Sequence, residues 1–142
     1  MDGLLLTFDT NFDIKQTRWE FLAFRLDSGR RPVQDWIEEL TVKAQNELES
    51  SMEFLSISPI TFWKMPQFKI LGDRYSGMGE IRFTSEGNRY RIYGYFGPKR
   101  MQFTLLHACM KQRSDLSAEM DIASHRKELV EANNRRAYAI TF

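Results

Sequence analysis

The chain has 142 residues and a net charge of +1, with 42% hydrophobic and 27% charged residues, which is typical of one globular domain and argues against disorder. No apolar run approaches the roughly 20 residues of a membrane-spanning helix, and no leader precedes Asp9, so we expect a cytoplasmic protein without a membrane partner. One cysteine and two histidines predict no disulfide and no metal site, and no cofactor is expected.

The N-terminal half is predicted to hold one strand and two helices. Residues 18–26 are rich in aromatic and aliphatic side chains at both parities, which indicates a buried strand. Pro32 suits the first position of a helix, and apolar residues then recur at three- and four-residue steps as far as Leu55. Because Thr41 is able to cap a helix, the sequence allows a short helix followed by a longer one, ending before Pro59.

Residues 59–77 are predicted as a structured loop, and three strands follow it in quick succession. The predicted strands cover residues 78–84, 88–96 and 100–108. Short turn sequences separate them, which favours an antiparallel meander. A final helix is predicted over 117–139, capped by Ser114 or Asp115. This order predicts an α+β fold with a single antiparallel sheet, packed by an N-terminal helical hairpin and a C-terminal helix.

Positive charge is concentrated in one part of the chain. Residues 64–113 hold ten Lys/Arg against three Asp/Glu, whereas residues 1–63 carry a net charge of −5 and residues 114–142 a net charge of −1. Such a segment predicts a face that binds a polyanion such as a nucleic acid. The alternative is a solvated, charge-balancing surface.

A two-residue turn at Glu86-Gly87 would place Arg82 opposite Arg91 in a hairpin. Arg89 and Tyr93 then share the face of these two arginines, and Phe83 lies on the opposite, core face. Two arginines directly opposite each other cost roughly 0.2 to 1 kcal/mol, so the pairing favours an anion between them.

Three residues of the hairpin leave alternatives open. Glu80 has the parity of Arg82 and would, if it bridged the arginines, merely neutralise this face. Tyr93 and Tyr95 would offer stacking surfaces to unpaired bases, or would face solvent without a function.

The third predicted strand and the loop after it carry further candidates. His107 is assigned to the core with Leu105 and Phe103, as a buried histidine with a satisfied hydrogen bond rather than a general base. Lys111 and Arg113 follow the strand, at a position where their side chains reach the polar face of the sheet.

Several segments resemble a known family. They are LGDRYSGMGEIRF (71–83), NRYRIYGYF (88–96), LLHACMK (105–111), Arg31-Pro32-Val33 with Trp36, and Glu119, Met120 and Ala123. Together they resemble the phage-derived, HigB-like branch of the RelE/ParE toxin superfamily. The resemblance covers residues 18–133 of a single domain spanning 1–142, and leaves an N-terminal extension at 1–17 and a C-terminal tail at 134–142.

The resemblance implies a RelE-like toxin of a type II toxin-antitoxin system. Such a toxin cleaves mRNA on the ribosome through attack of the 2′-hydroxyl, without a metal, and is neutralised by an antitoxin that often has a helix-turn-helix domain. Carried over to this chain, Arg91 stabilises the phosphate, with Arg82 and Lys111 beside it as the other catalytic residues. The predicted nucleic-acid contacts are Arg89, Arg113, Tyr93, Lys99, Arg100 and Lys69.

Two other functions remain open from the sequence. One is a ParE-like toxin that inhibits a protein target without cutting RNA. The other is a prophage-derived protein-binding module that keeps the fold without catalysis.

Overall fold

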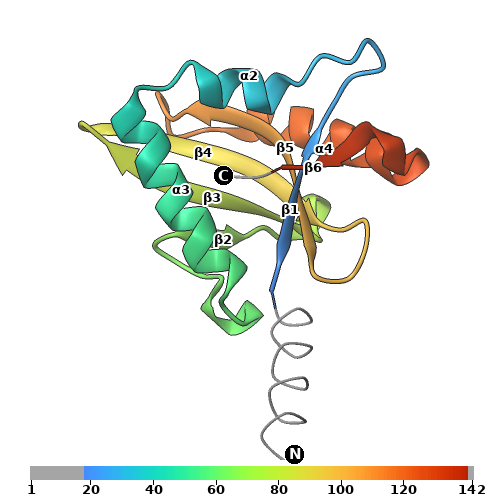
Figure 1. Ribbon diagram of the computed structural model, residues 1–142, viewed down its shortest axis with the longest axis horizontal. Coiled ribbons are helices and arrows are strands. Elements are labelled where there is room, and N and C mark those ends of the chain that lie inside the picture. The colour runs from blue at the N-terminus through green and yellow to red at the C-terminus, as the bar shows by residue number, and fades with distance from the viewer. Residues whose placement is uncertain (1–17, 141–142) are drawn as a thin grey trace, which may run out of the picture.

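The computed structural model describes residues 18–140, whose strands and helices form one sheet with helices on both faces (Figure 1). The strands are β1 (Glu20–Phe24), β2 (Phe68–Ile70), β3 (Met78–Ser85), β4 (Asn88–Phe96), β5 (Gln102–Met110) and β6 (Ala137–Ala139). The helices are α2 (Pro32–Glu38), α3 (Val42–Ser56) and α4 (Ser117–Ala132), with 3-10 turns η1 (Ile60–Phe62), η2 (Asp73–Tyr75) and η3 (Asn134–Arg136). The predicted extension at 1–17 lies outside the described residues. None of the described helices is long and apolar enough to cross a membrane.

The α+β class and the single sheet are confirmed, but the sheet is mixed rather than wholly antiparallel. The strand order is β2-β3-β4-β5-β1-β6, and β1 pairs with β5 in parallel. The helices and the meander separate these two strands along the chain, so the chain returns to β1 by a crossover connection instead of a hairpin. The predicted meander β3-β4-β5 is present as consecutive antiparallel pairs.

The hairpin between β3 and β4 has the predicted register. Arg82 pairs with Arg91 and Phe83 with Tyr90. Glu86 and Gly87 form the connection with φ angles of 53° and 82°, as a type I′ turn requires. The turn therefore determines which side chains of the two strands share a face.

The break between the first two helices is also confirmed. Pro32 is the first residue of α2, where its missing N–H costs no hydrogen bond. Thr41 is the N-cap of α3, and its hydroxyl accepts a hydrogen bond from the Ala44 N–H at 3.2 Å. The longer helix thus begins where the sequence predicts it.

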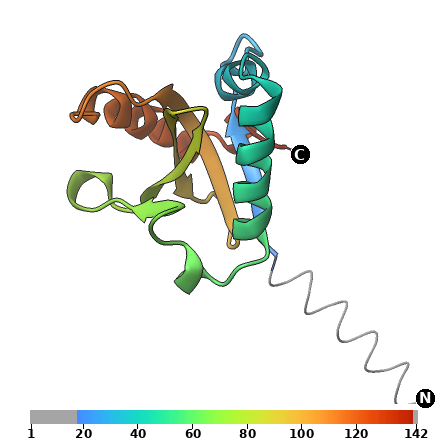
Figure 2. The ribbon, with the colours of Figure 1, turned by 90° about the vertical axis from the view of Figure 1, so that its left-hand side faces the viewer.

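Helices cover both faces of the sheet, with α3 on one side and α4 on the other (Figure 2). The core under α2 and α3 includes Phe21, Leu48, Trp63 and Phe103. A second core, which includes Tyr93, lies on the α4 side of the sheet. Because α4 packs on the face that carries the arginines, only part of that face is open to solvent.

The C-terminal segment differs from the predicted long helix. Helix α4 ends at Ala132, and β6 pairs with β1 at the edge of the sheet. Neither Ser114 nor Asp115 is the N-cap, which is Leu116; Asp115 instead accepts a hydrogen bond from the Ser117 N–H at 3.0 Å. The helical periodicity could not show that the last residues complete the sheet, since strand pairing depends on a distant partner.

Candidate functional site

Strands β3, β4 and β5 align polar side chains in cross-strand rows on the face that α4 partly covers. One row is Arg82, Arg91 and Cys109, and the next is Glu80, Tyr93 and His107. Cross-strand partners point to the same face, so these rows form one surface. Arg89 and Lys111 extend it, because the Lys111 N–H donates to the Arg89 carbonyl at 2.7 Å. We call Glu80, Arg82, Arg89, Arg91 and Lys111 the arginine face.

Arg91 is the buried cation of the arginine face. Its side chain is at the centre of β4, the residue is only 4% exposed, and its NH1 donates to the carbonyl of Tyr90 at 2.9 Å. Burial lowers the pKa of Arg91, and the neighbouring Arg82 lowers it further. Burial and the like charge of Arg82 thus both disfavour the charged form of Arg91, whereas Glu80 favours it.

Glu80 is the acidic residue of the arginine face. Its position agrees with the alternative in which its carboxylate neutralises part of the arginine charge. It is 6% exposed and lies 3.6 Å from the Nε of Arg82. Arg82 also contacts the sulfur of Met65. One carboxylate faces four cations on the arginine face, so Glu80 reduces the positive charge without cancelling it.

Lys111 follows β5 directly, and its ammonium group interacts electrostatically with the other residues of the arginine face. Burial, Arg91, Arg89 and Arg82, in that order, lower the pKa of Lys111. The three arginines are thus close enough to repel its ammonium group. Arg113 lies two residues further on, exposed at the same end of β5.

Sequence parity predicts His107 in the core with Leu105 and Phe103, and this prediction is wrong. A β-bulge between Tyr93 and Gly94 places Leu106 as an extra residue in β5, so His107 pairs with Tyr93 and joins the α4 face. The available signal was Gly94, since an isolated glycine in a strand indicates a bulge.

The His107 side chain is half-buried, and its Nε2 is hydrogen-bonded to the Glu119 carboxylate of α4. Burial lowers the pKa of His107, although Glu119 acts in the opposite direction. A carboxylate-bound imidazole is a common arrangement for proton transfer. His107, which the sequence pattern assigned to the core rather than to catalysis, is thus a candidate functional residue together with Glu119.

Tyr93 is not exposed, so the predicted stacking surface for RNA bases is wrong. Its side chain is 0% exposed within the core under α4, and Tyr95 is 4% exposed. Strand parity correctly placed both tyrosines on the face of the sheet that does not carry Phe83. It could not show that α4 covers this part of the face.

The remaining predicted contacts divide into two groups. Lys69 is exposed on the edge strand β2 and pairs with Glu80, so it borders the arginine face. Lys99 and Arg100 are exposed in the loop between β4 and β5, at the end of the hairpin away from Arg91. The fold does not bring these two residues to the arginine face.

The described residues offer no grouping for a metal. Within residues 18–140, no three His, Cys, Asp or Glu side chains are placed to hold a metal ion. Cys109 pairs with Arg91, but burial raises the pKa of its thiol to about 11. The thiol is therefore a poor nucleophile at neutral pH. The chemistry available at this face is that of arginine, lysine, histidine and carboxylate.

Comparison with known proteins identifies a family. A sequence model of the family described as "Phage derived protein Gp49-like (DUF891)" matches residues 35–129. The match includes α3, the meander, the arginine face, His107 and Glu119. No curated protein and no solved structure matches this chain.

Proposed function

The chain belongs to the phage-derived Gp49-like family, and from this membership we propose that it is the toxin of a type II toxin-antitoxin system that cleaves mRNA on the ribosome. The association of this family with toxin-antitoxin systems supports the toxin class. The resemblance of residues 71–83, 88–96 and 105–111 to HigB-like and RelE-like toxins supports ribosome-dependent cleavage.

The observation that carries the proposal is the uncompensated charge of the arginine face. Arg82 and Arg91 are direct cross-strand partners, and both contribute to the lowered pKa of Lys111. A phosphate group between these cations would relieve their repulsion. Arginine also suits this role because its guanidinium forms paired hydrogen bonds with phosphate oxygens.

The proposed reaction is transfer of a phosphate ester within the RNA. The 2′-oxygen forms a bond to the adjacent phosphorus, the bond from phosphorus to the 5′-oxygen breaks, and the products are a 2′,3′-cyclic phosphate and a 5′-hydroxyl. Arg91 and Arg82 stabilise the negative charge that develops on the phosphorane oxygens.

Two proton transfers complete this reaction. Nε2 of neutral His107 donates to Glu119, which leaves a lone pair on Nδ1 to accept the proton of the 2′-hydroxyl. Lys111, whose lowered pKa makes it a stronger acid, donates a proton to the departing 5′-oxygen. The reaction therefore needs no metal.

A second candidate function is protein binding without cleavage. Six exposed large apolar side chains lie between residues 54 and 70, from the end of α3 to β2. They are Phe54, Ile57, Ile60, Phe62, Met65 and Ile70. Where such side chains form one contiguous patch, the patch favours a protein partner. Since Met65 contacts Arg82, a protein docked here would lie beside the arginine face, as expected of either an antitoxin or a protein target.

Cleavage of mRNA on programmed ribosomes tests the proposed function. We expect Arg91→Gln to lower the single-turnover cleavage rate about 10²-fold, the cost typical of losing one donor to a developing anion. RNA binding should fall much less. Lys43→Gln is the matched control, because it removes an exposed charge on α3.

Thermal midpoints of both variants distinguish lost chemistry from lost folding, and Arg91→Lys restores the charge if the glutamine variant is unstable. Intact mRNA with the wild-type protein on active ribosomes would reject the nuclease. Retained toxicity in cells would then favour the ParE-like alternative, and harmless overexpression the protein-binding module.

A further inference from the structure

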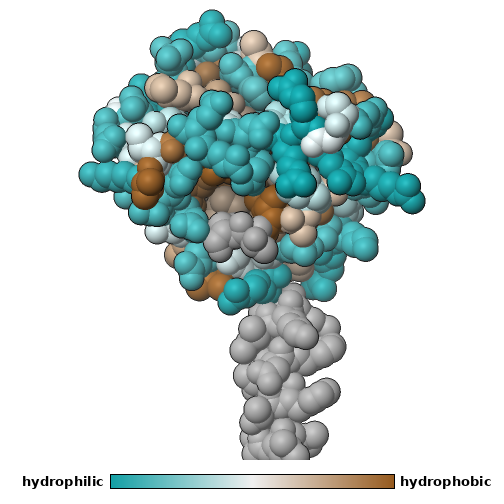
Figure 3. Space-filling model, turned by 45° about the horizontal axis from the view of Figure 1, so that its top comes forward, coloured by the Kyte–Doolittle hydropathy of each residue, from teal (hydrophilic) through white to brown (hydrophobic). Residues whose placement is uncertain are grey.

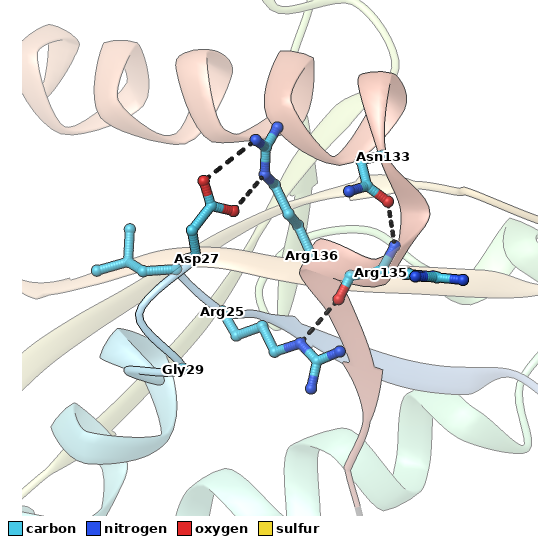
Figure 4. A pocket seen from close by; sticks show the side chains of 7 residues that line it. Arg25, Asp27, Gly29, Asn133, Arg135 and Arg136 are labelled. Atoms are coloured by element: carbon cyan, nitrogen blue, oxygen red, sulfur yellow. Dashed lines mark hydrogen bonds and ion pairs between the residues drawn. The ribbon is translucent and has the colours of Figure 1, made fainter.

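A second group of arginines lies away from the arginine face, around a pocket of about 270 Å³ at the end of β1. The pocket is bounded by the turn that follows β1 and by η3 after α4 (Figure 4). Its lining residues are Arg25, Leu26, Asp27, Gly29, Asn133, Arg135 and Arg136. We propose that this pocket binds a phosphate group. The proposal does not depend on the ribonuclease activity proposed above.

The sequence does not indicate the positive charge of this pocket. Its arginines come from residues 1–63 and 114–142, both of which have net negative charge. Folding brings them together because β6 pairs with β1, and the Arg25 N–H donates to the Arg136 carbonyl at 2.8 Å. Three arginines and one aspartate line the pocket, so positive charge is in excess.

The one acidic residue of the pocket is already paired. Asp27 receives hydrogen bonds from Nε and NH2 of Arg136 at 3.1 and 3.4 Å, and this lowers the pKa of Asp27. The NH1 of Arg136 donates to the Leu129 carbonyl at 3.1 Å. Arg136 therefore has a structural role, and Asp27 leaves the other two arginines uncompensated.

Arg25 is held in position but retains free donors. Its Nε donates to the Arg135 carbonyl at 2.7 Å, whereas its two terminal nitrogens have no partner within residues 18–140 (Figure 4). One N–H from each terminal nitrogen forms the fork that matches two phosphate oxygens. Because one hydrogen bond already restricts the side chain, binding would cost less conformational entropy.

Two neighbouring residues of the pocket carry further donors. The Asn133 side-chain oxygen accepts a hydrogen bond from the Arg135 N–H at 3.1 Å, so its amide NH₂ remains available as a donor. The guanidinium of Arg135 has no hydrogen-bond or ion-pair partner among the described residues and lies at the rim (Figure 4). Arg30 is exposed in the adjacent turn. Much of the molecular face drawn in Figure 3 is hydrophilic.

The phosphate could belong to a small phosphorylated molecule or to an RNA backbone, which present the same oxygens. The turn after β1 and the β3–β4 turn lie on opposite sides of the view in Figure 1. The pocket and the arginine face therefore need not bind the same phosphate, and substitutions can separate them.

Titration of the ¹⁵N-labelled full chain with inorganic phosphate, at constant ionic strength maintained with chloride, tests the proposal. We expect saturable shifts of the Arg25 Nε–H resonance and the Gly29 amide. Arg25→Gln, followed at the Gly29 amide, should weaken phosphate binding about tenfold, as expected from the loss of one charged hydrogen-bond donor group. Arg91→Gln and Lys43→Gln should leave these shifts unchanged.

Equal shifts with chloride alone, or unchanged binding in a folded Arg25→Gln variant, would overturn the proposal. If that variant does not fold, Arg135→Gln provides the same test, because the Arg135 side chain forms no hydrogen bond or ion pair within 18–140. Binding of a short single-stranded RNA at several salt concentrations then identifies the source. A smaller salt slope in the variant assigns an RNA backbone, and an unchanged slope with phosphate binding assigns a small phosphorylated ligand.

Discussion

At the scale of single residues, His107 shows how one inserted position changes a functional assignment. The bulge opposite Gly94 moves its side chain from the α2 and α3 core to the α4 face, where Glu119 binds it. A histidine in this setting contributes to stability and, in the proposed reaction, to proton transfer. Its protonation state therefore connects the folding of the chain with the chemistry of the arginine face.

The lowered pKa of His107 predicts a pH-dependent stability. A lowered pKa in the folded state means that the unfolded chain takes up the proton first as the pH falls, which favours unfolding. The contribution of His107 is fully present above its unfolded pKa of about 6.5, and it decreases as the pH falls below that value. Urea unfolding between about pH 7.5 and 5 measures how the free energy of unfolding changes with pH.

We expect His107→Gln to lose part of the decrease in the free energy of unfolding that the wild type shows on acidification. His125→Gln is the matched control, because His125 is an exposed histidine on α4. The same pH dependence in wild type and His107→Gln would show that His107 is not linked to stability in this way.

At the scale of secondary-structure elements, two glycines differ sharply in what surrounds them. A Cβ on Gly94 of β4 would lie 2.4 Å from the Thr104 carbonyl oxygen and 2.5 Å from the Phe103 ring. A Cβ on Gly72, in the turn before β3, would meet nothing within 4 Å. The strands β4 and β5 can approach at the bulge only because Gly94 has no side chain.

We expect Gly94→Ala to lower the free energy of unfolding by about 2 to 4 kcal/mol, because overpacking here meets backbone as well as a ring. Gly72→Ala should change it by no more than about 0.5 kcal/mol. Urea unfolding of the two variants at one pH measures the difference. Equal stabilities would show that β4 and β5 can move apart at Gly94 at little cost.

Across the whole molecule, positive charge is concentrated in two regions, although the chain is nearly neutral. The arginine face gathers cations from the 64–113 segment, whereas the Arg25 pocket gathers them from the two ends of the described chain. Local fields of this kind guide anionic ligands even when the net charge is close to zero.

RNA binding should therefore weaken as salt increases. Three or four phosphate contacts predict a slope of about −2 to −3 in a plot of log K against log salt concentration, at about 0.7 per phosphate on a single strand. Fluorescence anisotropy with a labelled single-stranded RNA measures the slope, and Lys43→Gln should not change it. Binding that is indifferent to salt would contradict an RNA-binding role and favour a protein partner.

Local features of the fold follow from short-range sequence patterns. The Glu86-Gly87 turn and strand alternation place Arg82 opposite Arg91 and Phe83 on the other face, since a hairpin register depends on neighbouring residues. Pro32 and Thr41 likewise indicate where α2 and α3 begin, because capping acts within a few residues.

Which of these side chains meet solvent, or each other, depends on tertiary contacts. Helix α4 packs over Tyr93 and buries it. The crossover connection makes β1 parallel to β5. The β-bulge places His107 next to Glu119. The pairing of β6 with β1 similarly unites Arg25 with Arg135. Each of these depends on contacts between segments far apart in the chain, which short-range sequence patterns do not encode.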